Sequence, residues 1–206
     1  MVITSVEESK NSKDILLVYI DGSYSFSISR EDYISLNLYE EKELTEEDVE
    51  YIKNTVNVRA AKYAAVKYLS LKQRSSGEVY GKLRREGYDS DEIEKAIEEL
   101  QDMGYINDRV YARKFVNDRI KLKPKSVRML KMELQNKGIE DEIIDEVLRE
   151  VDQDDEEIAL RLISKKFGRY DLRDEKVQKK AYTFLCGRGF SYNLASKVIN
   201  RIIKEK

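Results

Sequence analysis

The chain has 206 residues, which is enough for one domain or two small ones with a buried core. Charged residues make up 38% of it and hydrophobic residues 41%, a mixture that favours solvent-exposed helices over disorder. A single cysteine, Cys186, excludes an internal disulfide framework, and there is no apolar run of 18 residues and no charged-then-apolar leader, so we expect a cytoplasmic protein that is neither secreted nor membrane-spanning.

Charge is divided unevenly along the chain. Residues 1–56 contain 5 Lys/Arg and 13 Asp/Glu, a net charge of −8, whereas residues 57–206 contain 33 and 27, a net charge of +6. Such a division indicates two parts with different partners, or an acidic part that screens a basic one. Two solvated surfaces that differ by chance explain the same counts.

Residues 14–29 carry the one clear β-strand pattern. Asp21-Gly22 in their middle suits a type I′ hairpin turn, because both residues tolerate positive φ. Since a lone hairpin is marginal in water, we expect its apolar face to pack on a helix or on another strand from residues 1–6. Counting outward from the turn predicts these cross-strand neighbours: Tyr19 with Tyr24, Leu17 with Phe26, and Ile15 with Ile28.

Two helices should follow the hairpin. Residues 31–38 have the pattern of a short helix. Thr45 precedes Glu46-Glu47-Asp48, so it is a suitable cap for the next helix, whose first turn then carries acids that the helix dipole favours.

From there on the chain is helical and repetitive. A leucine, a glycine four residues later and an apolar residue after it recur twice at a spacing of 51 residues, and an alanine upstream recurs twice at a spacing of 47. The glycine suits a left-handed position after the second helix of each unit, where a β-carbon would be strained. The recurring residues are Leu83-Gly87-Tyr88, Leu134-Gly138-Ile139 and Leu185-Gly189-Phe190, and upstream Ala65, Ala112 and Ala159.

Units of about 50 residues are small to be stable alone, so stacking in series is expected. The sequence therefore predicts a mostly α fold: three tandem three-helix repeats in an elongated, curved array, preceded by a small β-hairpin-plus-helix region. The predicted boundaries are 1–56 for the acidic front, 57–106 for repeat one, 107–153 for repeat two and 154–206 for repeat three.

The side chains that most catalysis requires are scarce. There is no histidine, and Cys186 lies between apolar neighbours, where we expect a core thiol rather than a nucleophile. No glycine-rich loop follows a strand, and the paired carboxylates lie on amphipathic helices, where a solvated surface is the simpler interpretation. We expect no catalytic residue, cofactor or metal site, and no enzymatic activity.

A basic segment in the middle of the chain is the candidate for partner binding. It surrounds the only proline, Pro124, which fits the first turn of a helix, and between Arg119 and Lys131 it has no acidic residue. A helix start with nearby Lys and Arg suits an anion, either phosphate or a carboxylate-lined protein groove. A solvated basic face balanced by Asp118 and Glu133 is the alternative. The candidate residues are Arg113, Lys114, Arg119, Lys121, Lys123, Lys125, Arg128 and Lys131, with a lesser cluster of Lys82, Arg84 and Arg85 in repeat one.

Two further features concern nucleic acid. Most of the tyrosines near these charges fall where core packing is a simpler interpretation than base stacking. They are Tyr63, Tyr68, Tyr80, Tyr88, Tyr105 and Tyr111. Short three-helix units also resemble helix-turn-helix modules, which read DNA with one helix. The second helix of repeat two offers only Gln135 and Asn136 for such reading.

Three motifs are more specific than a helical repeat requires. Together they make residues 58–205 resemble the RecX-type regulatory proteins, which modulate the RecA recombinase. This chain has Lys123-Pro124 where that family often has Gly-Pro, so we expect a stiffer, more basic loop there. The motifs are Glu78-x4-Leu83-Arg84-Arg85-x-Gly87-Tyr88, Leu100-x3-Gly104-Tyr105-Ile106-Asn107-Asp108-x2-Tyr111-Ala112, and Leu134-x2-Lys137-Gly138-Ile139.

The resemblance implies a bacterial cytoplasmic protein that acts in recombination, DNA repair and the SOS response without being an enzyme. Such proteins lie in the groove of the RecA filament on single-stranded DNA and inhibit its ATP hydrolysis, strand exchange and co-protease activity. We therefore expect a monomer that binds the RecA filament through the basic face of repeats one and two, with weak or indirect contact to single-stranded DNA and none to a membrane. The alternative is a direct DNA-binding protein of repeated helix-turn-helix type.

Overall fold

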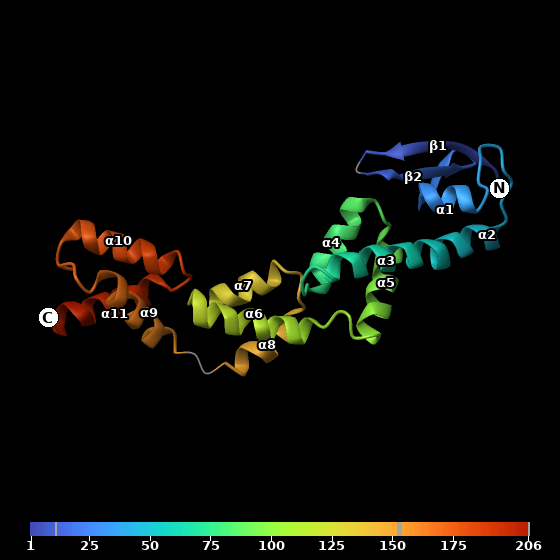
Figure 1. The fold of residues 1–206 in the computed structure, drawn as a ribbon. Helices are drawn as coiled ribbons and strands as arrows, with labels where there is room; N and C mark the ends of the chain where they lie inside the picture. Colours follow the sequence, from blue (N-terminus) through green and yellow to red (C-terminus); the bar gives the residue numbers. More distant parts are fainter. Residues whose placement is uncertain (11, 152–153, 206) are drawn as a thin grey trace. The chain divides into compact units, whose positions relative to one another are not determined.

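The computed structural model describes residues 1–10, 12–151 and 154–205. They form two compact units, Met1–Asp108 and Arg109–Lys206. The first contains a small sheet and the helices that follow it, and the second is helical throughout the described part (Figure 1).

The sheet is antiparallel, with β1 (Ile3–Ser9), β2 (Ser12–Ile20) and β3 (Ser23–Ser29) in that spatial order. The hairpin turn is where the sequence places it, since Asp21 and Gly22 have φ of 49° and 81°. The expected third strand from the N-terminus is confirmed as β1. Ser29 then caps α1 (Arg30–Ser35).

The predicted register of the hairpin is correct next to the turn and wrong beyond it. Tyr19 pairs with Tyr24 as expected, but Val18 pairs with Phe26 and Leu16 with Ile28, because a bulge adds one residue to β3. A bulge shifts every later side chain to the opposite face. Here it brings three large apolar β2 residues into the same buried cluster as two from β3, and that burial favours the shifted register. The cluster contains Leu16, Val18, Ile20, Phe26 and Ile28.

A continuous helical stretch connects the sheet to the repeats. It consists of α2 (Glu46–Tyr51), a π-helical segment η1 (Ile52–Asn57) and α3 (Val58–Leu69). The cap at Thr45 is confirmed, and Asp48 completes a capping box with it. The predicted boundary between residues 56 and 57 falls inside this stretch, whereas the one between 153 and 154 adjoins residues outside the described part.

Three tandem three-helix repeats are confirmed. Repeat one contains α3, α4 (Ser76–Glu86) and α5 (Ser90–Asp102). Repeat two contains α6 (Asp108–Leu122), α7 (Val127–Gln135) and α8 (Asp141–Arg149). Repeat three contains α9 (Asp155–Phe167), α10 (Glu175–Cys186) and α11 (Tyr192–Glu205). Each has its own core, and the recurring positions are fully buried: Ala65, Leu83, Ala112, Leu134, Ala159 and Leu185.

The glycine of each repeat has the left-handed conformation that its position predicts. Gly87, Gly138 and Gly189 have φ of 102°, 69° and 89°. Two of them also contact the preceding module closely: a β-carbon on Gly87 would lie 3.3 Å from the Ile15 side chain, and one on Gly189 would lie 2.5 Å from Ser126 Oγ. Glycine therefore serves both backbone conformation and close packing at these joints.

Two aspartates satisfy the first amides of helices that precede them in the chain. Asp108 accepts a hydrogen bond of 2.8 Å from the backbone amide of Ser76, the first residue of α4, and a second from the Ser76 hydroxyl. Asp155 accepts one of 3.1 Å from the amide of Val127, the first residue of α7. Because the first amides of a helix have no intrahelical partner, these carboxylates satisfy them and suit the helix dipole.

A polar network with buried Asn57 and Glu92 at its centre joins the sheet to repeat one. Asn57 Nδ2 donates to the Ser27 carbonyl and to Glu92 Oε1, both at 2.6 Å. Tyr24 donates its hydroxyl proton to Asp89 at 2.7 Å, and the Asp89 amide donates to Glu92 at 3.0 Å. Burial raises the pKa of the Glu92 carboxyl to about 7, although the hydrogen bonds from Asn57 and the Asp89 amide oppose that shift.

The raised pKa of Glu92 predicts a pH-dependent stability. Because its folded pKa of about 7 lies above an unfolded value near 4.3, the folded state favours the neutral acid, and stability is lost as pH rises through 7. Between pH 5 and pH 8 the free energy of unfolding should fall by roughly 2 kcal/mol more in the wild type than in Glu92→Gln, which cannot ionise. Urea denaturation at pH 5, 6.5 and 8 measures the difference, and a constant offset between the two proteins would contradict it.

The expected burial is wrong for Cys186 and for two of the six tyrosines. Cys186 is exposed, because it lies at the end of α10, where its neighbour Leu185 faces the core instead. Tyr68, Tyr80 and Tyr88 pack against the core of repeat one and Tyr111 against that of repeat two, as expected, but Tyr63 and Tyr105 are 76% and 57% exposed. In both cases a side chain next to a core position was assigned to the core.

Candidate partner-binding surface

The basic segment spans the end of α6, a short connection and the start of α7. Ser126 caps α7, accepting a hydrogen bond of 3.2 Å from the Met129 amide. Pro124 therefore lies two residues before the cap. The sequence-based prediction that it occupies the first turn of the helix is wrong. The proline instead limits the conformations of the connection that carries Lys123 and Lys125.

Four of the eight candidate cations in repeat two are engaged within the repeat itself. Arg113 lies 2.6 Å from Glu150 and 3.4 Å from Glu146. Arg119 Nε donates to Glu133 at 2.8 Å, and Lys125 also pairs with Glu133. Lys131 is 2.6 Å from Asp145, and this hydrogen bond raises the pKa of the Lys131 ammonium.

Glu133 is the centre of this intramolecular pairing. Its carboxyl is partly buried between two cations, so burial raises its pKa, but the hydrogen bonds from Lys125 and Arg119 outweigh burial and hold the pKa below its usual range. The guanidinium of Arg119 also lies 4.7 Å from the centroid of the Phe115 ring. Glu133 therefore balances the charges of Arg119 and Lys125, as the alternative of a balanced basic face predicts.

The other four candidate cations of repeat two face solvent. Lys114, Lys121, Lys123 and Arg128 are exposed, and no carboxylate of the described residues forms an ion pair with any of them. The candidate set thus divides into half-buried, paired cations and exposed, unpaired ones. Only the second group is available to an external anion without breaking an internal pair.

Repeat one divides in the same way. Lys82 pairs with Glu86 at 2.7 Å, one helical turn away. Arg84 donates to the Tyr88 carbonyl at 2.7 Å and lies 4.0 Å from Asp89. Arg85 is exposed and forms no ion pair within the described residues, so it is the repeat-one counterpart of the four exposed cations of repeat two.

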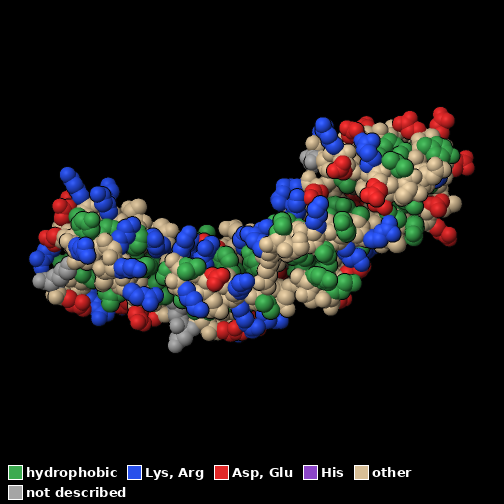
Figure 2. Space-filling model, viewed as in Figure 1, with side chains coloured by type: hydrophobic (Ala, Val, Ile, Leu, Met, Phe, Trp, Pro, Cys, Tyr) green, Lys and Arg blue, Asp and Glu red, His purple; other side chains and the backbone are tan. Residues whose placement is uncertain are grey.

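Repeat three carries a basic surface that the sequence analysis missed. Within the predicted boundaries the net charge is 0 for repeat one, +1 for repeat two and +5 for repeat three, so most of the basic surplus lies there. Counting charge per repeat finds it, whereas searching for an uninterrupted basic run does not. Figure 2 shows Lys and Arg side chains over this repeat and acidic ones over the N-terminal sheet. The exposed cations include Arg161, Lys165, Lys166, Arg169, Arg173, Lys176, Lys179 and Lys180.

Aromatic rings accompany the cations of repeat three. Two of these cations lie over the Phe184 ring, with Lys166 Nζ 4.1 Å and the Arg188 guanidinium 3.8 Å from its centroid. Tyr182 and Tyr192 stack with ring centroids 4.9 Å apart, and Tyr192 is 64% exposed. Phe184 is partly buried against the core of repeat three, whereas Tyr192 exposes its ring to solvent within a basic repeat, and such a ring suits a strand whose bases stack.

Other kinds of site find little support in the described part of the chain. Its helices include none with both the length and the apolar composition that crossing a bilayer demands. Within the same residues, no three or more Asp, Glu or Cys side chains gather in a way that would hold a metal ion.

Family models cover most of the sequence. The RecX N-terminal domain matches residues 1–45, and the first, second and third three-helix domains of RecX match residues 61–100, 107–148 and 153–199. The four matches follow one another in the order of the sheet and the three repeats.

Individual relatives match along the whole chain. A regulatory protein RecX of Clostridium botulinum is 31% identical over 205 residues, covering 98% of this chain and 96% of the relative, and that of Clostridioides difficile is 31% identical over 204 residues with the same coverage. Among solved structures, a crystal structure of regulatory protein RecX matches with a TM-score of 0.60 at 25% identity, over 100% of this chain and 99% of that one. RecX from Lactobacillus salivarius matches with a TM-score of 0.57 at 27% identity, over 73% of this chain and 99% of that one.

Proposed function

This chain belongs to the RecX family of regulatory proteins, and we propose from that membership that it binds the filament that RecA forms on single-stranded DNA and inhibits RecA's ATPase, strand-exchange and co-protease activities. It acts as a cytoplasmic monomer and by binding alone, without catalysis. Family membership along the whole chain is the observation that carries the proposal.

The exposed cations of each unit support binding to an anionic partner. Arg85, Lys114, Lys121, Lys123 and Arg128 are the candidate residues that remain available after internal pairing. Exposed cations attract an anionic partner at low desolvation cost, and they speed the encounter more than they strengthen the final complex. The paired group, Arg113, Arg119, Lys125 and Lys131, instead holds the helices of repeat two together.

This division predicts which variants lose inhibition. Lys121→Ala/Lys123→Ala/Arg128→Ala should leave the fold intact, because the three side chains are exposed and unpaired in the described structure, and should raise the concentration for half-inhibition about tenfold or more. The DNA-dependent ATPase rate of RecA, measured against increasing amounts of this protein, tests the prediction.

The control removes as much charge elsewhere. Lys10→Ala/Lys13→Ala/Arg59→Ala takes three exposed cations from the N-terminal region and from α3, and should inhibit as the wild type does. An ATPase rate that wild-type protein leaves unchanged at stoichiometric excess overturns the proposed function. If the wild type and the repeat-two variant inhibit with equal potency, the exposed cations of repeat two are not the binding surface.

Direct binding to DNA is the second candidate function. The net charge of +5 on repeat three and the aromatic rings beside its cations favour it. The helix-turn-helix version has less support, because Gln135, one of two residues suited to base reading on α7, donates its side-chain amide to Asp141 at 2.8 Å. Titrating labelled single-stranded DNA in the absence of RecA separates the two functions, because only direct DNA binding requires tight binding to DNA without RecA.

A further inference from the structure

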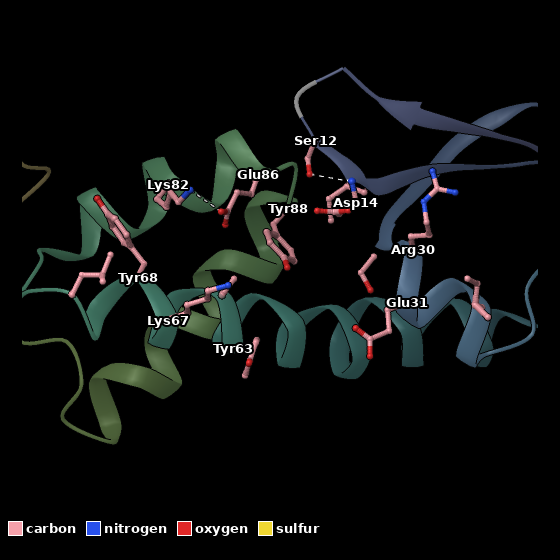
Figure 3. A pocket seen from close by; sticks show the side chains of 15 residues that line it. Ser12, Asp14, Arg30, Glu31, Tyr63, Lys67, Tyr68, Lys82, Glu86 and Tyr88 are labelled. Atoms are coloured by element: carbon pink, nitrogen blue, oxygen red, sulfur yellow. Dashed lines mark hydrogen bonds and ion pairs between the residues drawn. The ribbon is translucent and has the colours of Figure 1, made fainter.

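A groove of about 980 Å³ lies within the first unit, between the N-terminal sheet and repeat one. One wall is formed by the start of β2 and by α1, the floor by α3, and the other wall by α4 (Figure 3). The buried network around Asn57 and the packing of Gly87 on Ile15 hold these elements together. The side chains that decide its character are Ile34, Tyr63, Lys67, Leu71, Asp14 and Glu31.

The groove exposes large apolar side chains that no element of this unit covers. Ile34, Tyr63 and Leu71 are 69%, 76% and 77% exposed. Tyr63, Lys67 and Leu71 are four residues apart along α3 and the turn after it, so they share one face of the helix. A stripe at this spacing matches the apolar side chains of an amphipathic helix laid alongside it.

Unpaired charges of both signs line the groove. Lys67 on the α3 floor is exposed, and Asp14 and Glu31 on the wall of β2 and α1 are exposed; none of the three forms an ion pair with another described residue. Two other cations of the lining are already paired, Arg30 with Glu8 and Lys82 with Glu86. The wall of β2 and α1 belongs to the N-terminal region, residues 1–56, whose net charge of −8 repels a phosphate backbone. The groove therefore suits a polypeptide with charges of both signs better than a nucleic acid.

We propose that this groove docks an amphipathic helical segment of a partner protein. The apolar side chains of that segment contact Ile34, Tyr63 and Leu71, a carboxylate faces Lys67, and a Lys or Arg faces Asp14 and Glu31. The inference rests on the proposed function, because it takes the RecA protomer as the partner. It gives the N-terminal region a binding role apart from that of the exposed cations of repeat two.

Single substitutions in the groove test the proposal. Leu71→Glu and Tyr63→Glu place a charge among the apolar contacts, and each should weaken binding to RecA filaments on single-stranded DNA at least tenfold. Both side chains are more than three-quarters exposed, so the melting temperature should change little. Val66→Glu is the matched control, since Val66 lies on the same helix, is 36% exposed and does not line the groove. It should bind within about twofold of the wild type.

A cross-linking measurement keeps the test valid if a variant folds poorly. A benzophenone amino acid in place of Tyr63 should cross-link to a RecA peptide that contains apolar residues and charges of both signs, whereas the same group in place of Val66 should not. If the wild type binds filaments and both groove variants bind equally well, the groove is not the docking site, and the proposed function still stands. The same conclusion follows if the wild type binds filaments but position 63 gives no cross-link. Absence of any filament binding by the wild type overturns both.

Discussion

Gly189→Val should cost roughly 3–5 kcal/mol of the free energy of unfolding, as the sum of two effects. The first is backbone strain, because Gly189 has φ of 89°, where a β-branched residue is strongly disfavoured. The second is a clash, because a β-carbon there would lie 2.5 Å from Ser126 Oγ and 2.6 Å from Met129 Cβ. Neither neighbour moves easily. Ser126 is buried at the cap of α7, and the Met129 atom is a β-carbon attached directly to the helix backbone.

Gly104→Val is the control that separates the two effects. Gly104 has a similar φ of 78°, but a β-carbon there would have nothing within 4 Å. This variant should therefore lose only about 1–2 kcal/mol from backbone strain. Urea denaturation of both variants measures the difference. Equal losses would mean that the contact between the Gly189 turn and the start of α7 does not contribute to stability.

Asn57→Ala should cost roughly 2–4 kcal/mol, because it removes the donor that serves two buried acceptors. Asn57 is 2% exposed, and its side-chain amide reaches both the Ser27 carbonyl on β3 and the Glu92 carboxyl on α5. Alanine leaves both oxygens buried without this partner. Besides lowering overall stability, the loss should speed hydrogen exchange of the β3 amides, since the sheet would be held less firmly to repeat one.

The neighbouring Asn54 provides the control. It lies in the same π-helical segment, and its side chain accepts a hydrogen bond of 2.6 Å from Lys95 at an exposed position. Asn54→Ala should change the free energy of unfolding by no more than about 0.5 kcal/mol. If both alanine variants unfold at the wild-type urea concentration, the network does not join the sheet to repeat one.

Only part of the candidate site was predictable from the sequence. The basic run from Arg119 to Lys131 is visible as soon as the charges are marked, but its division into paired and exposed cations is not. Glu133 lies close in sequence to both of its partners, whereas Arg113 meets Glu150 from 37 residues away. Helix packing decides such pairs, and a list of charges carries no information about it. The groove beside α3 is hidden from the sequence for the same reason.

By itself the sequence determined the features that depend on local geometry. Three repeats, their glycine positions, the cap at Thr45 and the hairpin turn all follow from backbone conformation and from the period of apolar residues, which act within a few residues of each other. Only the tertiary structure decided the hairpin register beyond the bulge, the burial of Glu92, the pairing of Arg113 and the exposure of Tyr63. Each of these depends on which elements pack together over long separations in the chain, where small differences in packing energy select one arrangement among several that the local pattern allows.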